Sequence, residues 1–126
     1  RIILAAHQAL LFDADSDSAT TGVYRKQTVK VGDLVPPMAT KISELMSDLE
    51  KYINENKSLP ALIQAGLVHL QFETIHPFLD GNGRLGRLLI AFILCVDGFM
   101  REPMLYRRFV FKTQRQRSRR CGAWVG

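Results

Sequence analysis

The sequence predicts an all-α domain that carries a small β-hairpin flap. Four stretches of the 126-residue chain repeat apolar residues at helical spacing, and one short stretch alternates polar with β-branched residues. This length is enough for one small domain, and the 47% of hydrophobic residues can fill its core.

The first predicted helix covers residues 2–12. Its apolar residues recur at helical spacing and share one face: Ile2, Ile3, Ala6, Ala9 and Leu10. Residues 13–21 follow, and their many Asp, Ser and Thr side chains indicate a solvated loop.

A hairpin-like flap is predicted over residues 23–35. Residues 27–31 alternate polar with β-branched residues, which is typical of a strand, and Gly32 with Asp33 suits a turn. An ordered surface loop is the alternative for so short a segment, and the sequence leaves both open.

Pro36 and Pro37 end the flap and precede a second helix, which should end near residues 54–57. Its apolar residues form one stripe with charged residues elsewhere: Ile42, Leu45, Met46, Leu49 and Ile53. The second helix should therefore cover the core with one face only.

The third helix is predicted over residues 62–75, which are apolar on most sides. Ser58 suits its N-terminal cap, with Pro60 near its first turn. Pro77 disfavours helical geometry at the residue before it, so this helix should end at His76.

A fourth helix is predicted from about Gly83 to Asp97, and Gly98 suits the position after its C-terminal cap. Apolar residues cover nearly its whole surface: Leu85, Leu88, Leu89, Ile90, Phe92, Ile93, Leu94 and Val96. We therefore expect this helix at the centre of the domain.

The formal net charge of +5 comes from one segment. Residues 107–120 hold seven of the 17 basic residues and no acidic one, so ten basic residues face 12 acidic ones elsewhere, a net of −2. The domain is therefore not predicted to bind nucleic acid. Residues 107–126 are interpreted as a basic, atypical tail: 108–116 could form a helix, and 117–126 are expected to be disordered.

The two cysteines, Cys95 and Cys121, make neither a metal-ligand cluster nor a disulfide framework. A reducing compartment, the cytoplasm, is the simpler expectation. We expect no membrane partner, because no apolar run reaches the length of a membrane span and the N-terminus lacks a signal-peptide pattern. The chain begins without methionine, so we expect it to be an excised piece.

The densest chemistry lies between His76 and Arg87, which read His-Pro-Phe-Leu-Asp-Gly-Asn-Gly-Arg-Leu-Gly-Arg. Its three central residues, Gly81, Asn82 and Gly83, tolerate positive φ and suit a tight turn with inward-pointing N–H groups. Such a turn before a helix start binds anions, because free donors and the positive end of the helix dipole meet there. An ordinary turn before a helix is the structural alternative.

Charged residues flank this turn. Arg84 and Arg87 lie three positions apart on the new helix and share a face, which suits two guanidiniums for a polyphosphate. Asp80 comes just before the turn. From the residues alone, it could equally hold the magnesium of such a substrate or favour the helix dipole.

His76 is the candidate catalytic base, because attack by a hydroxyl on phosphorus needs a base of near-neutral pKa within hydrogen-bond reach. A lone histidine before a helix break is more often structural, but the adjacent anion turn reverses that preference here. His7 and His69 lack such a context, and His69 is interpreted as a core residue. Phe78 is interpreted as a structural anchor that buries its ring and fixes the loop.

This stretch resembles the Fic motif, His-x-Phe-x-(Asp/Glu)-Gly-Asn-Gly-Arg-x-x-Arg, and every defined position fits. A looser resemblance runs from the start of the chain to Tyr106. The resemblance implies a Fic-type helical domain over residues 1–106, truncated at both ends, with a β-hairpin flap. Gly22, Tyr24 and Arg25 resemble the start of the family's flap, which docks the target protein.

The implied activity is that of a protein adenylyltransferase, which moves AMP from Mg-ATP to a Ser, Thr or Tyr hydroxyl of a target protein and releases pyrophosphate. By resemblance, His76 is the base, Asp80 holds Mg²⁺, and the ATP phosphates bind to Gly81, Asn82, Gly83, Arg84 and Arg87. The resemblance places the γ-phosphate on Arg87.

Two alternatives stay open. One is related chemistry, such as phosphate transfer, another nucleotide donor or removal of AMP, although Gly83 stands where Doc-type toxins often have lysine. The other is a fragment that binds nucleotide or protein without turnover. A homodimer is also left open. Thr40 to Glu44 matches half of the family's inhibitory motif by chance, so we expect no inhibition by an internal glutamate.

Overall fold

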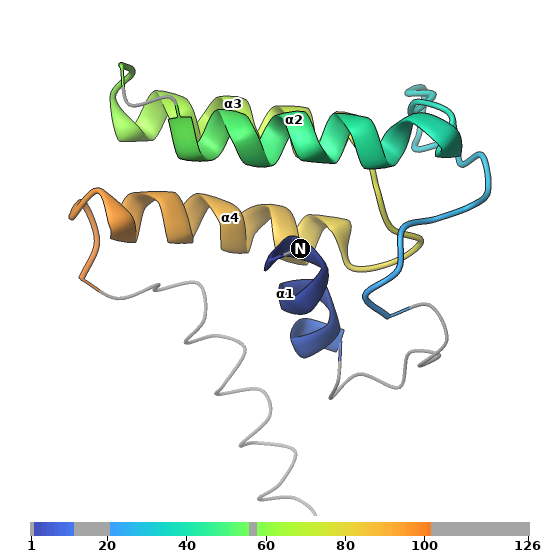
Figure 1. Cartoon of the computed structure of the whole chain (residues 1–126), viewed down its shortest axis with the longest axis horizontal. Coiled ribbons are helices and arrows are strands. Elements are labelled where there is room, and N and C mark those ends of the chain that lie inside the picture. Colours follow the sequence, from blue (N-terminus) through green and yellow to red (C-terminus); the bar gives the residue numbers. More distant parts are fainter. Residues whose placement is uncertain (1, 12–20, 56–57, 102–126) are drawn as a thin grey trace, which may run out of the picture.

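The computed structural model describes residues 2–11, 21–55 and 58–101. In these ranges the chain forms α1 (Ile2–Leu11), α2 (Ile42–Glu55), α3 (Ala61–Ile75) and α4 (Asn82–Val96), with the 3₁₀ turn η1 (Ala39–Lys41) leading into α2 (Figure 1). The predicted all-α class is confirmed, and each predicted helix is present within about two residues of its expected limits, apart from the start of α2, which was not predicted to a residue.

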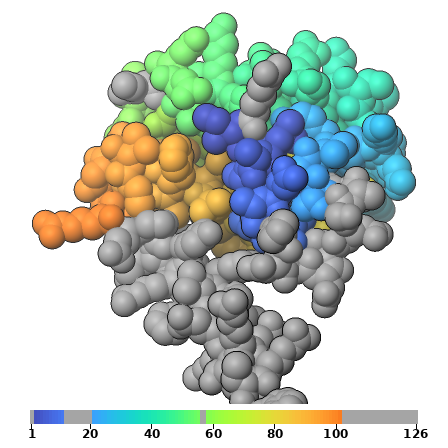
Figure 2. All heavy atoms as spheres, turned by 60° about the horizontal axis from the view of Figure 1, so that its bottom comes forward, coloured from blue at the N-terminus to red at the C-terminus, as the bar shows by residue number. Residues whose placement is uncertain are grey.

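The helices stack around the contact between α3 and α4, which run antiparallel (Figure 1). Helix α2 packs on α3, and α1 packs on α4. Figure 2 shows α1, in dark blue, beside the light-blue segment that begins at residue 21. Helices α3 and α4 therefore join the other elements into one body.

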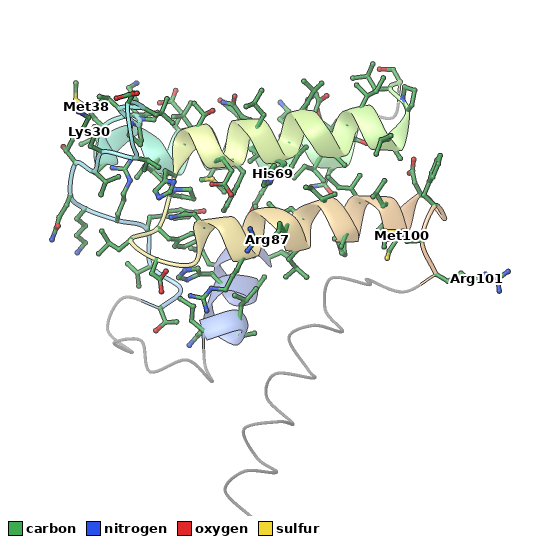
Figure 3. All side chains as sticks on the ribbon, turned by 180° about the vertical axis from the view of Figure 1, so that it is seen from behind. Lys30, Met38, His69, Arg87, Met100 and Arg101 are labelled. Atoms are coloured by element: carbon green, nitrogen blue, oxygen red, sulfur yellow. The ribbon has the colours of Figure 1, made fainter. Side chains whose placement is uncertain are left out.

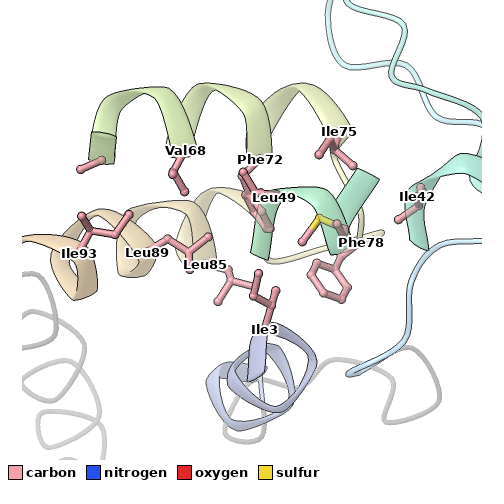
Figure 4. Packing of buried hydrophobic residues seen from close by; sticks show 12 residues of the cluster. Ile3, Ile42, Leu49, Val68, Phe72, Ile75, Phe78, Leu85, Leu89 and Ile93 are labelled. Carbon is pink, nitrogen blue, oxygen red and sulfur yellow. The ribbon is translucent and has the colours of Figure 1, made fainter. Parts of the chain in front are cut away.

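Side chains from all four helices meet in a single core (Figure 4). The cluster consists of Ile3, Ile42, Met46, Leu49, Ala65, Val68, Phe72, Ile75, Phe78, Leu85, Leu89 and Ile93. Phe78 comes from the loop between α3 and α4 and is fully buried. The loop is therefore fixed to the core by its own side chain.

Helix α4, which was expected at the centre of the domain, packs on α3 and α1 but is not covered on all sides. Phe92 and Val96 of α4 are 57% and 71% exposed. The outer face of α3 is also apolar and exposed at Leu62, Leu67 and Leu70. Among the described residues no element covers these faces, so an apolar sequence did not mean burial here.

The helix ends follow the proline and glycine positions, with one difference. Helix α3 has Pro60 as its N-cap, and the N–H groups of Ile63 and Gln64 donate to the Pro60 carbonyl. The cap predicted at Ser58 is therefore wrong by two residues. Gly98, with φ of 76°, follows the C-cap of α4 as predicted.

The predicted flap contains a turn but no strand among the described residues. Val31 and Leu34 form one antiparallel bridge around Gly32, whose φ is 58°. The strand expected over residues 27–31 is not found, so the hairpin is not confirmed. A two-stranded hairpin without a neighbouring sheet is marginal, which accounts for this outcome.

No helix in the described parts of the chain is long and apolar enough to cross a membrane. The loop predicted over residues 13–21 lies outside the described residues except for Thr21. The tail predicted over 107–126 lies outside them entirely.

Helices α3 and α4 approach closely where α4 carries Gly86. A Cβ added to Gly86 would lie 2.6 Å from Glu73 Oε1 and 2.8 Å from His69 Nδ1. Figure 3 shows His69 on α3, the helix that faces α4. The absence of a side chain at Gly86 therefore sets the spacing of the two helices that hold the loop.

We predict that Gly86→Ala lowers the free energy of unfolding. The added methyl group overpacks the contact by about 1–3 kcal/mol, which outweighs the roughly 1 kcal/mol that alanine gains in a helix. Gly66→Ala is the matched control, because a Cβ at this helical position meets nothing within 4 Å. Urea denaturation should show Gly66→Ala as stabilising; equal stabilisation by Gly86→Ala would contradict the close contact.

Candidate functional site

The site lies in the loop that joins α3 to α4. Helix α3 ends at Ile75, with His76 as its C-cap, and α4 begins at Asn82 after its N-cap Gly81. Because the two helices are antiparallel, the end of one and the start of the other lie at the same end of the pair (Figure 1). The loop thus brings a histidine and a helix N-terminus together.

His76 has a left-handed backbone, with φ of 48° and ψ of 61°. It is the single non-glycine residue with positive φ in the described part of the chain. Such a conformation costs on the order of 1–3 kcal/mol and persists only where the surroundings hold it. The helix ends there as predicted, and the His76 N–H still donates to the Phe72 carbonyl at 3.0 Å.

The imidazole of His76 is half-buried, and its Nδ1 atom is buried without a hydrogen-bond partner among the described residues. An unpaired buried polar atom costs about 1–3 kcal/mol. Because Nδ1 is closed to solvent, exchange of a proton with a substrate would fall on the other ring nitrogen, Nε2.

Asn82 closes the loop with its side chain. Its Oδ1 accepts from the Phe78 N–H at 3.0 Å, and its Nδ2 donates to the Phe78 carbonyl at 2.7 Å. The side chain is 3% exposed. The side chain therefore shapes the turn, and the backbone N–H of Asn82, to which phosphate binding was assigned, is left for an anion.

The start of α4 offers free backbone donors. The first bond of the helix runs from the Leu85 N–H to the Gly81 carbonyl at 2.9 Å. The N–H groups of Asn82, Gly83 and Arg84 precede it and have no carbonyl within the helix. Gly81, with φ of 83°, makes this abrupt start possible. These donors lie at the positive end of the α4 dipole, which favours an anion.

Asp80 and Arg84 form an ion pair beside these donors. Arg84 Nη2 lies 3.0 Å from Asp80 Oδ2, and the two side chains are 31% and 68% exposed. The other oxygen, Oδ1, accepts from the Gly81 N–H at 2.6 Å. An exposed pair of this kind contributes roughly 0–1 kcal/mol, so a phosphate or a cation can replace either partner.

Mg²⁺ fits this donor set only together with a substrate. The described residues contain no group of three His, Cys, Asp or Glu residues that could hold a metal alone. Magnesium, however, is usually bound through one or two carboxylates plus substrate phosphates and water. Asp80, with its exposed carboxylate at the start of α4, is the residue that fits that role.

Arg87 is exposed one turn after Gly83 (Figure 3). Its Nη1 atom lies 3.5 Å from the point where a Cβ on Gly83 would stand. The guanidinium therefore folds back along α4 toward the free N–H groups.

His7, which was not assigned to the site, contacts the loop directly. Its ring stacks on Phe78, with centroids 3.7 Å apart and planes 6° apart. Nδ1 accepts from the Gly22 N–H at 2.9 Å, so Nε2 carries the proton and donates to the Asp80 carbonyl at 2.8 Å. His7 lies four residues after Ile3 and four before Leu11, so the three share one face of the helix. This spacing was the available sequence signal that His7 is buried.

Burial sets the ionisation of His7. Loss of water lowers the pKa of its imidazole, although the bond to the Asp80 carbonyl opposes the shift. The neutral ring is also the form that the bonding requires, because Nδ1 is an acceptor. His7 therefore joins α1 to the loop as an uncharged link.

The three residues predicted for the flap line its inner side. Gly22 has φ of 75° and bonds to His7. Tyr24 packs on Phe78 with ring centroids 5.5 Å apart, and its pKa is raised by burial and then by the charge of Glu50. Arg25 is 3% exposed. The side chains of Tyr24 and Arg25 thus face inward, and the target-docking role predicted for Gly22, Tyr24 and Arg25 stays a prediction.

Comparison with known proteins decides the family. The model of the Fic/DOC family matches residues 1–94. The chain belongs to the Fic/DOC family. The motif resemblance from His76 to Arg87 is confirmed by this match, whereas the predicted limit of the Fic domain at residue 106 stays a prediction.

Curated Fic relatives include the protein adenylyltransferase Fic of Drosophila grimshawi, which is 36% identical over 99 residues. That match covers 77% of this chain and 20% of the relative. Drosophila yakuba has a similar protein, also 36% identical. The chain therefore spans about a fifth of the length of the curated relatives it matches.

Solved Fic structures agree with the fold. A Fic family protein from Desulfovibrio desulfuricans G20 has a TM-score of 0.63 and 36% identity, and the match covers 82% of this chain and 31% of that one. Fic-1 from C. elegans has a TM-score of 0.66 and 28% identity, and the match covers 76% of this chain and 28% of that one. The arrangement of helices around the loop is thus that of Fic domains.

The half-match to an inhibitory motif does not reach the site. Glu44 pairs with Lys41 at 3.1 Å, and both side chains are exposed. The structure gives Glu44 no bond to Arg87 within the described residues. The interpretation of Thr40 to Glu44 as a chance match stays a prediction.

We predict that Asn82→Ala destabilises the domain. Both backbone groups of Phe78 would lose their partner in a buried place, at about 1–3 kcal/mol for each group. Urea denaturation measures the loss. Asn54→Ala is the control, because Nδ2 of Asn54 donates to the Glu50 carbonyl at the surface. Similar small effects of both substitutions would contradict the closing role of Asn82.

We predict that acid weakens the fold through His7. Its pKa is lowered in the folded chain, so below about 6.5 the unfolded chain takes up a proton first. Stability from this group is complete above that pH and falls as the pH drops toward the folded pKa. Denaturation of the wild type and of His7→Phe across this range should show a steeper acid loss in the wild type. Parallel curves would contradict the prediction.

Proposed function

We propose that this protein transfers AMP from Mg-ATP to a Ser, Thr or Tyr hydroxyl of a target protein and releases pyrophosphate. The observation that carries the proposal is the placement of His76 at the end of α3, in the short loop that leads to the free N–H groups at the start of α4. The adenylyltransferase names of the curated relatives support it.

The start of α4 would hold the triphosphate. The N–H groups of Asn82, Gly83 and Arg84 donate to phosphate oxygens, and the helix dipole adds to the attraction. Arg87 reaches back along the helix and binds the γ-phosphate in the same role that the motif resemblance gives it. This grip leaves the α-phosphorus toward His76, on the other side of the turn.

Asp80 would hold the Mg²⁺ that accompanies ATP. To do so its carboxylate gives up the exposed bond to Arg84, which costs little and frees the guanidinium for phosphate. The bound ion supplies charge neutralisation for the phosphate oxygens.

His76 would accept the proton of the target hydroxyl while the hydroxyl oxygen attacks the α-phosphorus. The new bond joins that oxygen to phosphorus, and the bond between the α-phosphorus and the oxygen bridging to the β-phosphorus breaks. The bonding electrons leave with pyrophosphate, and the proton stays on the imidazole. The free N–H groups of α4 stabilise the charge that builds on the phosphate oxygens.

The exposed backbone after Arg25 would dock the target. Residues 26–28 and 30 are exposed and lack regular pairing among the described residues, so an extended chain can bond to them along its backbone. Pairing of this kind recognises shape rather than sequence. The predicted cytoplasmic location and the homodimer stay predictions.

The test uses ATP labelled either at the α- or at the γ-phosphate, with a cell lysate as acceptor. AMP transfer puts the α-label and not the γ-label into protein. His76→Ala should lower α-labelling by about 10²–10⁴-fold, because a positioned base contributes that much. The same variant should still bind ATP, since α4 is unchanged.

Two controls separate the outcomes. Arg87→Ala should weaken ATP binding, and Lys41→Ala, which removes an exposed cation outside the site, should leave both binding and labelling unchanged. Label from γ-ATP alone would assign phosphate transfer instead. Binding of ATP without label from either form, in wild type and His76→Ala alike, would overturn the enzyme proposal.

A further inference from the structure

Arg25 is a buried cation whose hydrogen-bond partners in the described structure are all backbone carbonyls. Its side-chain donors bind four carbonyls, and its own N–H binds a fifth: Nε to His76 at 2.7 Å, Nη1 to Gln27 at 2.7 Å, Nη2 to Pro37 at 2.7 Å and Ile75 at 3.2 Å, and the backbone N–H to Pro77 at 2.8 Å. No carboxylate pairs with it among the described residues. A guanidinium fork can serve several acceptors at fixed angles, which a lysine cannot do.

The bonds to α3 satisfy the end of that helix. The last carbonyls of a helix have no partner within it and carry the negative end of its dipole. The positively charged Arg25 side chain donates hydrogen bonds to two of these carbonyls, those of Ile75 and His76. Burial lowers the pKa of this guanidinium, but the carbonyls around it stabilise the charged form. The cap of α3 thus comes from a residue 50 positions away in sequence.

The same bonds fix the backbone on both sides of the His76 Cα. The carbonyl of Ile75 belongs to the peptide plane before it, and the carbonyl of His76 belongs to the plane after it. Each peptide unit is planar, so holding both planes sets φ and ψ of His76. The bond to the Pro77 carbonyl extends this control by one more unit. The left-handed conformation is therefore held by contacts that converge on Arg25.

We infer that Arg25 is a positioning residue for AMP transfer. It holds the backbone of His76 so that the imidazole is directed toward the N-terminus of α4, where the phosphates would bind. The inference rests on the proposed function, in which His76 is the base. Arg25 itself touches neither the donor nor the acceptor.

Arg25 also fixes both ends of the exposed flap segment. Its Nη1 holds the carbonyl of Gln27, near the start of the segment, and its Nη2 holds the carbonyl of Pro37, just after its end. One side chain therefore sets the position of the base and of the surface on which a target would lie. The incoming hydroxyl and the imidazole would therefore keep a fixed position relative to each other.

The test compares wild type with Arg25→Lys and Arg25→Ala. The maximal rate of α-label transfer to lysate protein is measured at saturating ATP, and the Kd for ATP separately. Arg25→Lys keeps the charge and the buried stem but loses the fork, so the imidazole shifts. A displacement of the imidazole by about 1 Å lowers the maximal rate by about 100-fold. The Kd for ATP should be unchanged, because α4 binds the phosphates.

Chemical rescue distinguishes positioning from loss of fold. Arg25→Ala leaves space for the missing guanidinium, so added methylguanidinium should restore part of the rate, whereas urea at the same concentration should not. If Arg25→Ala does not fold, Arg25→Lys decides, with its rate expressed per folded molecule from its denaturation curve. Lys41→Ala, which removes an exposed cation outside the site, is the control and should keep the wild-type maximal rate.

The outcomes separate this inference from the proposed function. No α-label from wild type would reject the function itself. Transfer by wild type together with a wild-type maximal rate in Arg25→Lys would overturn the positioning role. A raised requirement for lysate protein with an unchanged maximal rate would also overturn it, because that result assigns Arg25 to target docking.

Discussion

The rest of the structure depends on the closed turn from His76 to Asn82. The chain must leave α3 and enter α4 in the opposite direction within a few residues, and it does so with left-handed residues at both ends, His76 and Gly81. The two bonds between the Asn82 side chain and the Phe78 backbone close the turn. The Phe78 ring then attaches it to the core. Without this closure, neither the base nor the phosphate donors would have a fixed place.

Three buried polar side chains hold the turn from outside, and each comes from a different part of the chain. His7 binds the Asp80 carbonyl from α1, Arg25 binds the end of α3 from the flap, and Asn82 binds from α4 itself. Each uses backbone groups of the turn as partners. The groups that chemistry requires, such as the imidazole of His76, are left without such partners. One set of residues therefore holds the loop in place, and a different residue, His76, is left for the chemistry.

Much of the fold could be predicted from the sequence because its signals are local. Apolar periodicity located four helices, and Pro77 and Gly98 marked two of their ends. The Fic family followed from twelve consecutive residues. The candidate base, the free N–H groups and the exposed carboxylate of Asp80 all lie within that stretch, so their proximity was already implied by the chain.

What could not be predicted depends on contacts between distant segments. The link from His7 to the loop spans more than 70 positions, and that from Arg25 about 50, so no local pattern reveals either. The flap residues were assigned to target docking by resemblance, and no local pattern showed that Tyr24 packs on Phe78. The fourth helix was expected at the centre of the domain. Its composition could not show that Phe92 faces away from every described element.

The contact at Gly86 has a consequence for how this protein can change over generations. Glu73 Oε1 and His69 Nδ1 lie 2.6 Å and 2.8 Å from the point where a Cβ on residue 86 would be, so the two atoms are at most about 5.4 Å apart. Neither atom has a partner among the described residues. Substitutions at positions 69, 73 and 86 should therefore be correlated. A protein with a larger residue at 86 should have smaller side chains at 69 and 73 on the opposite helix.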